Sequence, residues 1–402
     1  MGLSLLAAAA TAAAVAAADP ATVRWQGLVE ALRAEQQIHG IPALALVLLD
    51  QGRPVRQAVH TLPGAPALHH DTPFRWGSMS KTVTALAVLQ AAHARGVDLH
   101  TPVTHWLPRP PYRNPWTARQ PVRLVHLLEL TAGLADLSRA EFDDNTPRSL
   151  GAALQRGAAG RVIRWPPGMQ HSYSNVPPGI AAAVLERIGG EPFDEAVARG
   201  VFEPLGMSGA SFQPLPGLPS GFRADGVTPI PYLHVTFPAF GGLNASPQDM
   251  GRLLEALLNR GRVDGGRAIP EPVVERAFRA ESSLGARHGL EIAYGAGVYG
   301  WVRDGHRFLG HGGDADGYLS RFGLLPEAGR GYLLGINVDD PRLFGRLRRL
   351  VERARVRGPD PVLPQAWTTA SFTPGKLRST CSISPGSTRL PRSLSWRSVR
   401  PR

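Results

Sequence analysis

The sequence predicts an α/β fold of the α+β type: one antiparallel sheet of about five strands, flanked by terminal helices, with a large all-helical insert. Strand-like segments occur near both ends of the 402-residue chain, whereas from about 135 to 280 the pattern is helices broken by glycine and proline. Hydrophobic residues make up 43% of the chain, which is enough for a sizeable core. Strands from the two ends can therefore pair in one sheet on which both terminal helices pack.

The first part of the sheet is expected within residues 19–75. Apolar residues at helical spacing predict a helix over about 21–38. The apolar run 43–49 predicts a buried strand, and the turn at 50–53 joins it to a second strand at 54–60. These two strands form a hairpin.

The helical region is expected over 76–284 and the second part of the sheet over 285–358. Asp304-Gly305 is a strong hairpin signal between two strand-like segments. Asp340 precedes Pro341 and an amphipathic run, which predicts a terminal helix. The strands expected in this part cover about 298–303, 306–311, 319–325 and 332–338.

The net charge of +12 is confined to the C-terminal end of the chain. Residues 341–402 hold 14 basic and 2 acidic residues, so residues 1–340 hold 30 of each. A basic groove for nucleic acid is therefore not implied. Residues 359–402 contain no acid after Asp360 and show no periodicity, which predicts a disordered basic tail.

Residues 1–18 are apolar and uncharged, and small residues precede Asp19. This pattern predicts a signal peptide cleaved after Ala18, although the start lacks the usual Lys or Arg. We expect an exported protein, periplasmic or secreted, whose mature chain has no stable membrane span. The single cysteine, Cys381, excludes an intramolecular disulfide and a cysteine-based metal cage.

The segment Phe74–Gln90 carries the strongest chemical signal. Ser78 is followed three residues later by Lys81 and then by an apolar run of helical period. We expect Ser78 to lie at the helix N-terminus, with the Lys81 amine within reach of its hydroxyl. A serine beside a titratable amine is an activated-nucleophile arrangement.

Such a short pattern also arises by chance, but lysine is rare in this chain. Only Lys81 and Lys376 are lysine among 44 basic side chains. Arginine does not lose its proton in proteins, whereas a buried lysine can titrate and act as a base. The composition therefore favours a functional role for Lys81.

Two further motifs accompany this pair. Tyr-x-Asn occurs as Tyr173-Ser174-Asn175 and also as Tyr112-Arg113-Asn114, and His311-Gly312-Gly313 follows an expected strand. With Ser-x-x-K, these motifs and the strand–helix–strand order resemble the serine β-lactamase and penicillin-binding-protein family over about 22–340. The resemblance is nearest to its class C, DD-peptidase and esterase-like branch.

The resemblance favours Tyr173 over Tyr112, because Tyr173 follows Trp165-Pro166-Pro167-Gly168 and precedes an apolar helix. It implies that Tyr173 and Lys81 share the proton transfers of a Ser78 nucleophile.

The resemblance also implies the binding groups. Asn175 and His311–Gly313 would hold substrate, and the backbone N–H groups of Ser78 and Asp314 would form an oxyanion hole. Histidine stands at 311 where many relatives have lysine, which weighs against efficient recognition of a substrate carboxylate.

The sequence therefore predicts a serine hydrolase that works through an acyl-enzyme, with no cofactor and no metal. Its substrate would be a small molecule or a peptidoglycan-type peptide: a D-Ala-D-Ala peptide, a β-lactam or a small ester. The alternative is a penicillin or muropeptide receptor that stays acylated, or a degenerate relative. The sequence leaves the substrate and the oligomeric state open.

Overall fold

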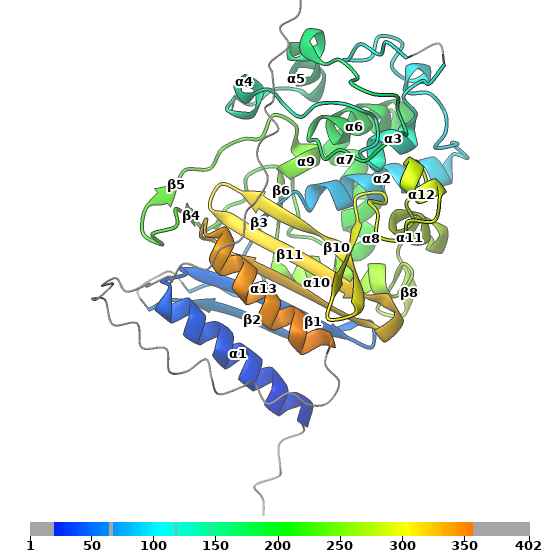
Figure 1. Cartoon of the computed structure of the whole chain (residues 1–402). Helices are drawn as coiled ribbons and strands as arrows, with labels where there is room; N and C mark the ends of the chain where they lie inside the picture. Colours follow the sequence, from blue (N-terminus) through cyan, green and yellow to red (C-terminus); the bar gives the residue numbers. More distant parts are fainter. Residues whose placement is uncertain (1–19, 64–66, 117–118, 145, 357–402) are drawn as a thin grey trace, which may run out of the picture. The chain divides into compact units, whose positions relative to one another are not determined.

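A six-stranded antiparallel sheet forms the centre of the fold (Figure 1). The computed structural model describes residues 20–63, 67–116, 119–144 and 146–356. The strand order is β2-β1-β12-β11-β10-β9, so strands from the two ends of the chain meet where β1 pairs with β12. The strands are β1 (Ala43–Asp50), β2 (Arg53–Thr61), β9 (Tyr299–Arg303), β10 (His306–Ala315), β11 (Tyr318–Leu325) and β12 (Arg330–Ile336).

The expected fold class is confirmed, with six strands in the sheet where about five were expected. The N-terminal hairpin of β1 and β2 joins the C-terminal strands β9–β12 through the pairing of β1 with β12, and all six segments expected to be strands belong to this sheet. The expected signal peptide (1–18) and basic tail (359–402) lie outside the described residues. The expected region boundaries at 75, 284 and 358 stay predictions.

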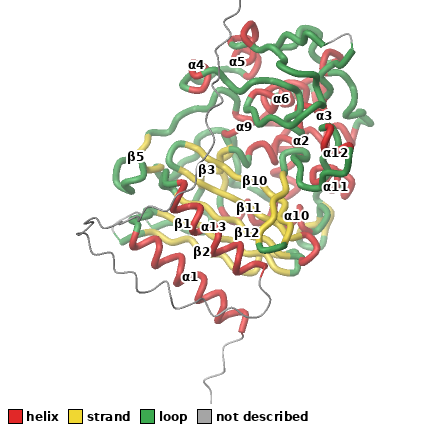
Figure 2. The backbone as a smooth tube through the Cα atoms, viewed as in Figure 1, coloured by secondary structure: helices red, strands yellow, loops and turns green. Residues whose placement is uncertain are grey.

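Strand β1 shows how the two faces of the sheet are filled. Leu44, Leu46 and Leu48 alternate with neighbours that face the other way, as successive side chains of a strand do. The three leucines pack with α1 (Pro20–Ile38) and α13 (Pro341–Val356), which lie over one face of the sheet (Figures 1 and 2). Because both faces of β1 are covered, the strand is a nearly continuous apolar run.

The other face of the sheet packs against the helical region. Its hydrophobic core centres on α2, which is buried along most of its length. The helices are α2 (Ser80–Ala94), α3 (Leu124–Leu128), α4 (Arg139–Phe142), α5 (Leu150–Arg156), α6 (Val176–Gly189), α7 (Phe193–Val197), α8 (Glu203–Leu205), α9 (Pro238–Gly241), α10 (Pro247–Leu258), α11 (Glu271–Phe278) and α12 (Leu284–Arg287). Helical turns of the 3-10 type occur at Val103–His105, Ala158–Gly160 and Pro326–Ala328, and a π-helical turn occurs at Ala198–Phe202.

The expectation of an all-helical insert is wrong in detail, because short strands occur within 76–284. They are too short to show an alternating pattern, so periodicity does not reveal them. They are β4 (Gly221–Phe222), β5 (Pro229–Ile230), β6 (Leu243–Ala245), β7 (Arg262–Val263) and β8 (Gly266–Arg267), and β6 pairs with β3 (Phe74–Gly77). Among the described helices, none is both long and apolar enough to cross a bilayer.

Glu352 on α13 fastens the terminal helix to the sheet. Its carboxylate is fully buried and accepts hydrogen bonds from Trp301 Nε1 at 3.1 Å and the Tyr332 hydroxyl at 2.9 Å. It also forms an ion pair with Arg303, at 2.8 Å from Nε. One carboxylate therefore joins α13, β9 and β12, and its removal would leave buried donors without an acceptor.

We expect Glu352→Ala to lower the free energy of unfolding by about 3 kcal/mol, because breaking a buried ion pair leaves its partners uncompensated. Glu327→Ala, at an exposed position, serves as the matched control and should change stability by less than about 0.5 kcal/mol. Chemical denaturation followed by circular dichroism measures both. Equal stability of the two variants would show that Glu352 does not hold α13 in place.

Candidate active site

Ser78 lies in a tight turn between β3 and α2. Gly77 has φ +51°, a conformation that glycine adopts at little cost, and the Met79 N–H donates to the Trp76 carbonyl at 3.2 Å. Helix α2 begins at Ser80, so the expectation that Ser78 opens the helix is wrong by two residues. Ser78 and Met79 instead form the turn that follows Gly77.

Close backbone contact between β3 and β10 brings Ser78 next to Asp314. A Cβ atom at Gly313 would lie 1.9 Å from the Trp76 carbonyl oxygen. At Gly77 it would lie 2.5 Å and 2.7 Å from the backbone oxygen and nitrogen of Asp314. Both positions therefore require glycine, and the backbone of Asp314 lies beside the residue that precedes Ser78.

The amine of Lys81 is the centre of the polar contacts around Ser78. Its Nζ lies 3.0 Å from Ser78 Oγ, 2.7 Å from Asn175 Oδ1 and 3.1 Å from the Phe240 carbonyl oxygen. The Lys81 side chain is only 3% exposed. It enters from the first turn of α2, Asn175 precedes α6, and Phe240 belongs to α9. The helical region therefore supplies every partner of the amine except Ser78 itself.

Burial lowers the pKa of the Lys81 amine to about 7, and the nearby negative charge of Asp136 opposes this effect without cancelling it. A neutral amine is consequently well populated near neutral pH. Such an amine can accept the proton of Ser78, which a permanently charged side chain cannot do.

The Tyr173 side chain lies close enough to Ser78 for the serine hydroxyl to affect the pKa of the phenol, and 43% of the residue's surface is exposed. Lys81 Nζ lies 4.8 Å from the centre of the Tyr173 ring. Desolvation raises the pKa of Tyr173 well above its usual value, so its hydroxyl stays protonated at neutral pH. A protonated phenol at this place can donate a proton or relay one.

The competing Tyr112 has a different environment. It is 8% exposed and packs in the hydrophobic core of the helical region, and Arg113 pairs with Val162. Of the two Tyr-x-Asn matches, the structure brings the one at Tyr173 to Ser78.

Asp136 is a member of this group that the sequence did not reveal. Its carboxylate accepts hydrogen bonds from the backbone N–H of Asn175 at 2.7 Å and from Asn175 Nδ2 at 3.2 Å. These bonds turn the amide oxygen of Asn175 towards Lys81. Asp136 lies in a loop with no motif around it, so only the folded arrangement shows this role.

His311 is buried, and its ring is held by groups of this chain. The residue is 1% exposed; its Nδ1 lies beside the Gly312 carbonyl oxygen and its Nε2 lies 2.9 Å from the Tyr294 hydroxyl. Burial, reinforced by the charge of Lys81, lowers the pKa of His311 to about 3. The ring is therefore neutral, Nδ1–H donates to the carbonyl, and Tyr294 donates to Nε2. Both ring nitrogens thus have partners within the chain, and His311 also lines the cavity in front of Ser78, so its contact with substrate stays a prediction.

Gly312 and Gly313 lie on a stretch of β10 that extends beyond its neighbour. The pairing of β9 with β10 ends at Tyr299 and Gly310, so in the described sheet the edge from His311 to Ala315 has no strand partner on that side. An open edge offers backbone N–H and C=O groups to an extended ligand.

A cavity of about 850 Å³ opens in front of Ser78. Its lining includes Tyr173, Tyr294, Tyr299 and the end of β10, together with the apolar side chains of Met169, Leu290 and Ile292. Among the described residues, no group of His, Cys, Asp or Glu is arranged to hold a metal ion. The groups that can act on a ligand here are those around Ser78.

The chain is similar in sequence to proteins named as an esterase and as a penicillin-binding protein. Esterase EstB of Burkholderia gladioli is 29% identical over 59% of this chain, which spans 65% of the esterase's length. Penicillin-binding protein 4 of Amycolatopsis lactamdurans is 26% identical over 76% of this chain and 82% of its own length.

Among solved structures, a β-lactamase/D-alanine carboxypeptidase from Yersinia pestis has the same fold. Its TM-score is 0.69 at 20% identity, over 84% of this chain and 98% of that one. The sequence profile of the Beta-lactamase family matches residues 26–355. A match over most of the chain, together with this fold, shows that the chain belongs to the Beta-lactamase family.

Proposed function

We propose that this chain is a serine hydrolase that forms an acyl-enzyme on Ser78. The observation that carries the proposal is the buried Lys81 amine, with a pKa of about 7, at 3.0 Å from Ser78 Oγ. The neutral amine takes the proton of Ser78 as Oγ attacks a carbonyl carbon. The backbone N–H groups of Ser78 and Asp314 stabilise the oxyanion that forms.

Tyr173 completes the proton transfers. Its hydroxyl protonates the leaving group, and the protonated Lys81 restores the proton to Tyr173. The leaving group departs as a neutral molecule and Ser78 carries the acyl group. A water molecule then attacks the ester, and its proton returns to Ser78 Oγ through the same groups. Asn175 holds Lys81 in place through the bond that Asp136 orients.

The names of the relatives support hydrolysis at a carbonyl and do not select one substrate. Esters, D-Ala-D-Ala peptides and β-lactams all offer such a carbonyl. We also propose that the chain is exported, on the basis of the apolar, uncharged segment 1–18. A receptor that stays acylated is the second candidate, and the same experiment distinguishes it.

Intact-mass measurement after incubation with p-nitrophenyl acetate and, separately, with penicillin tests the proposal. A transient adduct that Ser78→Ala abolishes is the expected result with at least one probe. A permanent adduct with both would indicate a receptor. No adduct and no turnover with either would contradict the proposed function.

The pH dependence of acylation should follow Lys81. Single-turnover acylation should be constant above pH 7 and fall about tenfold for each pH unit below about 7, because the protonated amine cannot accept a proton. His311 should add no second inflection between pH 4 and 8, since its pKa is about 3. Stopped-flow measurement with p-nitrophenyl acetate gives the profile.

Lys81→Arg should reduce acylation by at least about 10³-fold, because arginine keeps the positive charge and does not release its proton. Circular dichroism checks that the variant folds. A folded variant that acylates within about tenfold of the wild type would make Lys81 a structural cation.

Tyr173→Phe removes only a hydroxyl and should lower turnover by at least about 10²-fold, the scale of general acid catalysis. Tyr112→Phe is the matched control in the other Tyr-x-Asn motif and should change turnover by less than about threefold. The reverse order of effects would place Tyr112 at the site.

A further inference from the structure

We propose that the apolar wall formed by Met169, Leu290 and Ile292 binds the alcohol part of the substrate, so that the preferred substrates are esters with a neutral, aliphatic leaving group. This inference rests on the proposed function and names the substrate class of the same site. The three side chains line the cavity that contains Ser78.

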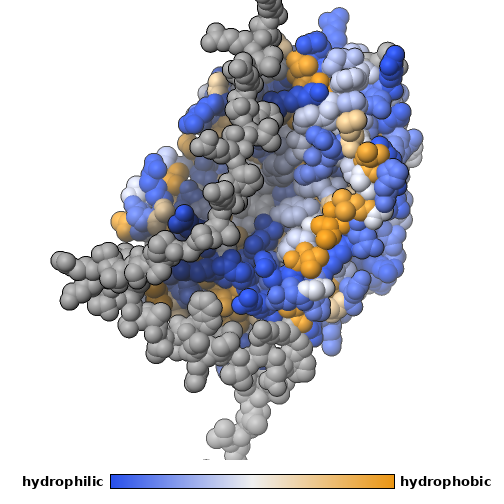
Figure 3. Space-filling view, in the orientation of Figure 1, coloured by the Kyte–Doolittle hydropathy of each residue, from blue (hydrophilic) through white to orange (hydrophobic). Residues whose placement is uncertain are grey.

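Large apolar side chains are concentrated and open to solvent at this wall. Met169, Leu290 and Ile292 are 47%, 57% and 46% exposed. Figure 3 shows hydrophobic residues gathered in a band on the face where Figure 1 draws α12 and β10. Exposed apolar groups that line a cavity next to a nucleophile are typical of a binding surface.

The position of Tyr173 shows which half of the substrate meets this wall. Its side chain lies beside Ser78, and its hydroxyl is the proton donor for the leaving group in the proposed mechanism. Met169 and His171 lie on the same segment of the chain as Tyr173, and all three line the cavity. A leaving group that takes its proton from Tyr173 therefore lies on the apolar side of Ser78.

The charges at this wall favour a neutral group over an anion. The cavity-lining residues between 283 and 293 are Ser283, Gly285, Leu290, Ile292 and Ala293, and all are uncharged. The carboxylate of Glu291, on the same loop, is 80% exposed and forms an ion pair with Arg307 of β10 at 4.0 Å, so that arginine is not left free to bind an anionic group. A D-alanine leaving group would bring its own carboxylate next to these residues. A neutral alcohol carries no such charge.

The arginine among the cavity-lining residues, Arg321, belongs to the sheet and not to the apolar wall. Arg321, on β11, packs its guanidinium 5.6 Å from the Tyr299 ring and 5.1 Å from the Trp301 ring. One of its nitrogens lies 2.9 Å from the place a Cβ of Gly312 would occupy. These contacts fix the charge at β9 and β10.

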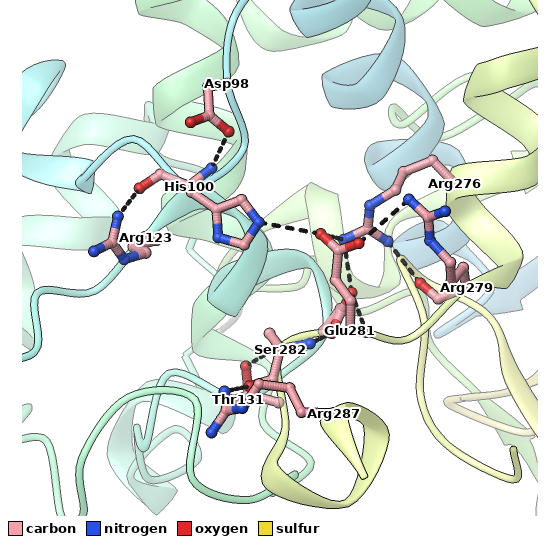
Figure 4. A network of polar contacts seen from close by, with 10 residues as sticks. Asp98, His100, Arg123, Thr131, Arg276, Arg279, Glu281, Ser282 and Arg287 are labelled. Atoms are coloured by element: carbon pink, nitrogen blue, oxygen red, sulfur yellow. Dashed lines mark hydrogen bonds and ion pairs between the residues drawn. The ribbon is translucent and has the colours of Figure 1, made fainter. Parts of the chain in front are cut away.

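The wall is held in place by a buried polar network (Figure 4). Glu129 is fully buried, and its carboxylate accepts hydrogen bonds from the backbone N–H groups of Glu281 and Ser282. Arg276 forms ion pairs with both Glu129 and Glu281, at 2.7 Å and 2.9 Å. The loop that carries Leu290 and Ile292 therefore starts from a fixed point.

Two further bonds complete the attachment of this loop. The Thr131 and Ser282 hydroxyls lie 2.6 Å apart, as Figure 4 shows. The Leu284 N–H donates to the Met169 carbonyl at 3.1 Å, so the two segments of the wall are joined. A wall fixed before the substrate arrives binds with a smaller loss of conformational entropy.

Two ester series with matched chains test the proposal. Ethyl, butyl and hexyl acetates differ only in the alcohol and all give the same acetyl-enzyme, so the deacylation rate constant should be equal for all three. We expect kcat/KM to rise about twofold for each added methylene, half of the effect of full burial because the wall is partly exposed. Ethyl acetate, butyrate and hexanoate, which lengthen the acyl chain instead, should differ by less than about fivefold.

The double variant Leu290→Ser/Ile292→Ser should reduce the hexyl-to-ethyl ratio of kcat/KM from about 15 to about 3. Val302→Ser is the control, because Val302 is 50% exposed on β9 and is not among the cavity-lining residues. It should leave the ratio unchanged.

A chain-length effect confined to the acyl series, or no effect in either series, would overturn the assignment of the wall to the alcohol. An unchanged ratio in the double variant would do the same. These outcomes differ from a failure of the proposed function, in which no ester is hydrolysed and Ser78 takes up no acyl group.

Discussion

The amine of Lys81 lies between the sheet and the helical region, 3.0 Å from Ser78 Oγ and almost without access to water. Its contacts come from Asn175, just before α6, and from Phe240, on α9. Desolvation lowers the pKa of the amine to about 7, and the charge of Asp136 keeps it from falling further. Packing of the helical region around this amine therefore sets the proton affinity on which the proposed chemistry depends.

A second constraint is the contact of β3 with β10. Gly77 and Gly313 let the two backbones approach so closely that a Cβ at either position would collide with the other strand. The same contact ties the turn of Ser78 to the open edge of β10. Since β10 is a strand of the main sheet, the geometry at Ser78 depends on the pairing of strands from both ends of the chain.

The sequence predicted the fold class because its signals are local. The Asp304-Gly305 turn and the apolar run of β1 each indicate a strand pair without any tertiary information. The spacing of Ser78 and Lys81 likewise predicted their contact, although Ser78 lies in the turn before α2 and not on the helix itself. The exact start of α2 escaped prediction, because the turn after Gly77 depends on the distant strand β10.

Residues with tertiary roles could not be identified from local patterns. Asp136 acts through Asn175, which lies 39 positions later in the chain. Tyr294 determines which nitrogen of His311 carries the proton, and nothing around Tyr294 in the sequence indicates this. His311 itself was expected to meet substrate because of its motif. Its burial follows from the aromatic side chains that β9 and the preceding loop place against it.

Direct titration of the Lys81 amine tests the central claim, and the composition of the chain makes it practicable. With only Lys81 and Lys376 in the sequence, labelling with ¹³Cε-lysine gives two resonances, which Lys376→Arg assigns. The account predicts that the Lys81 resonance titrates with a midpoint at about pH 7 in the folded protein. A midpoint near 10.4, the value of an unperturbed lysine, would contradict it and leave Ser78 without its proposed base.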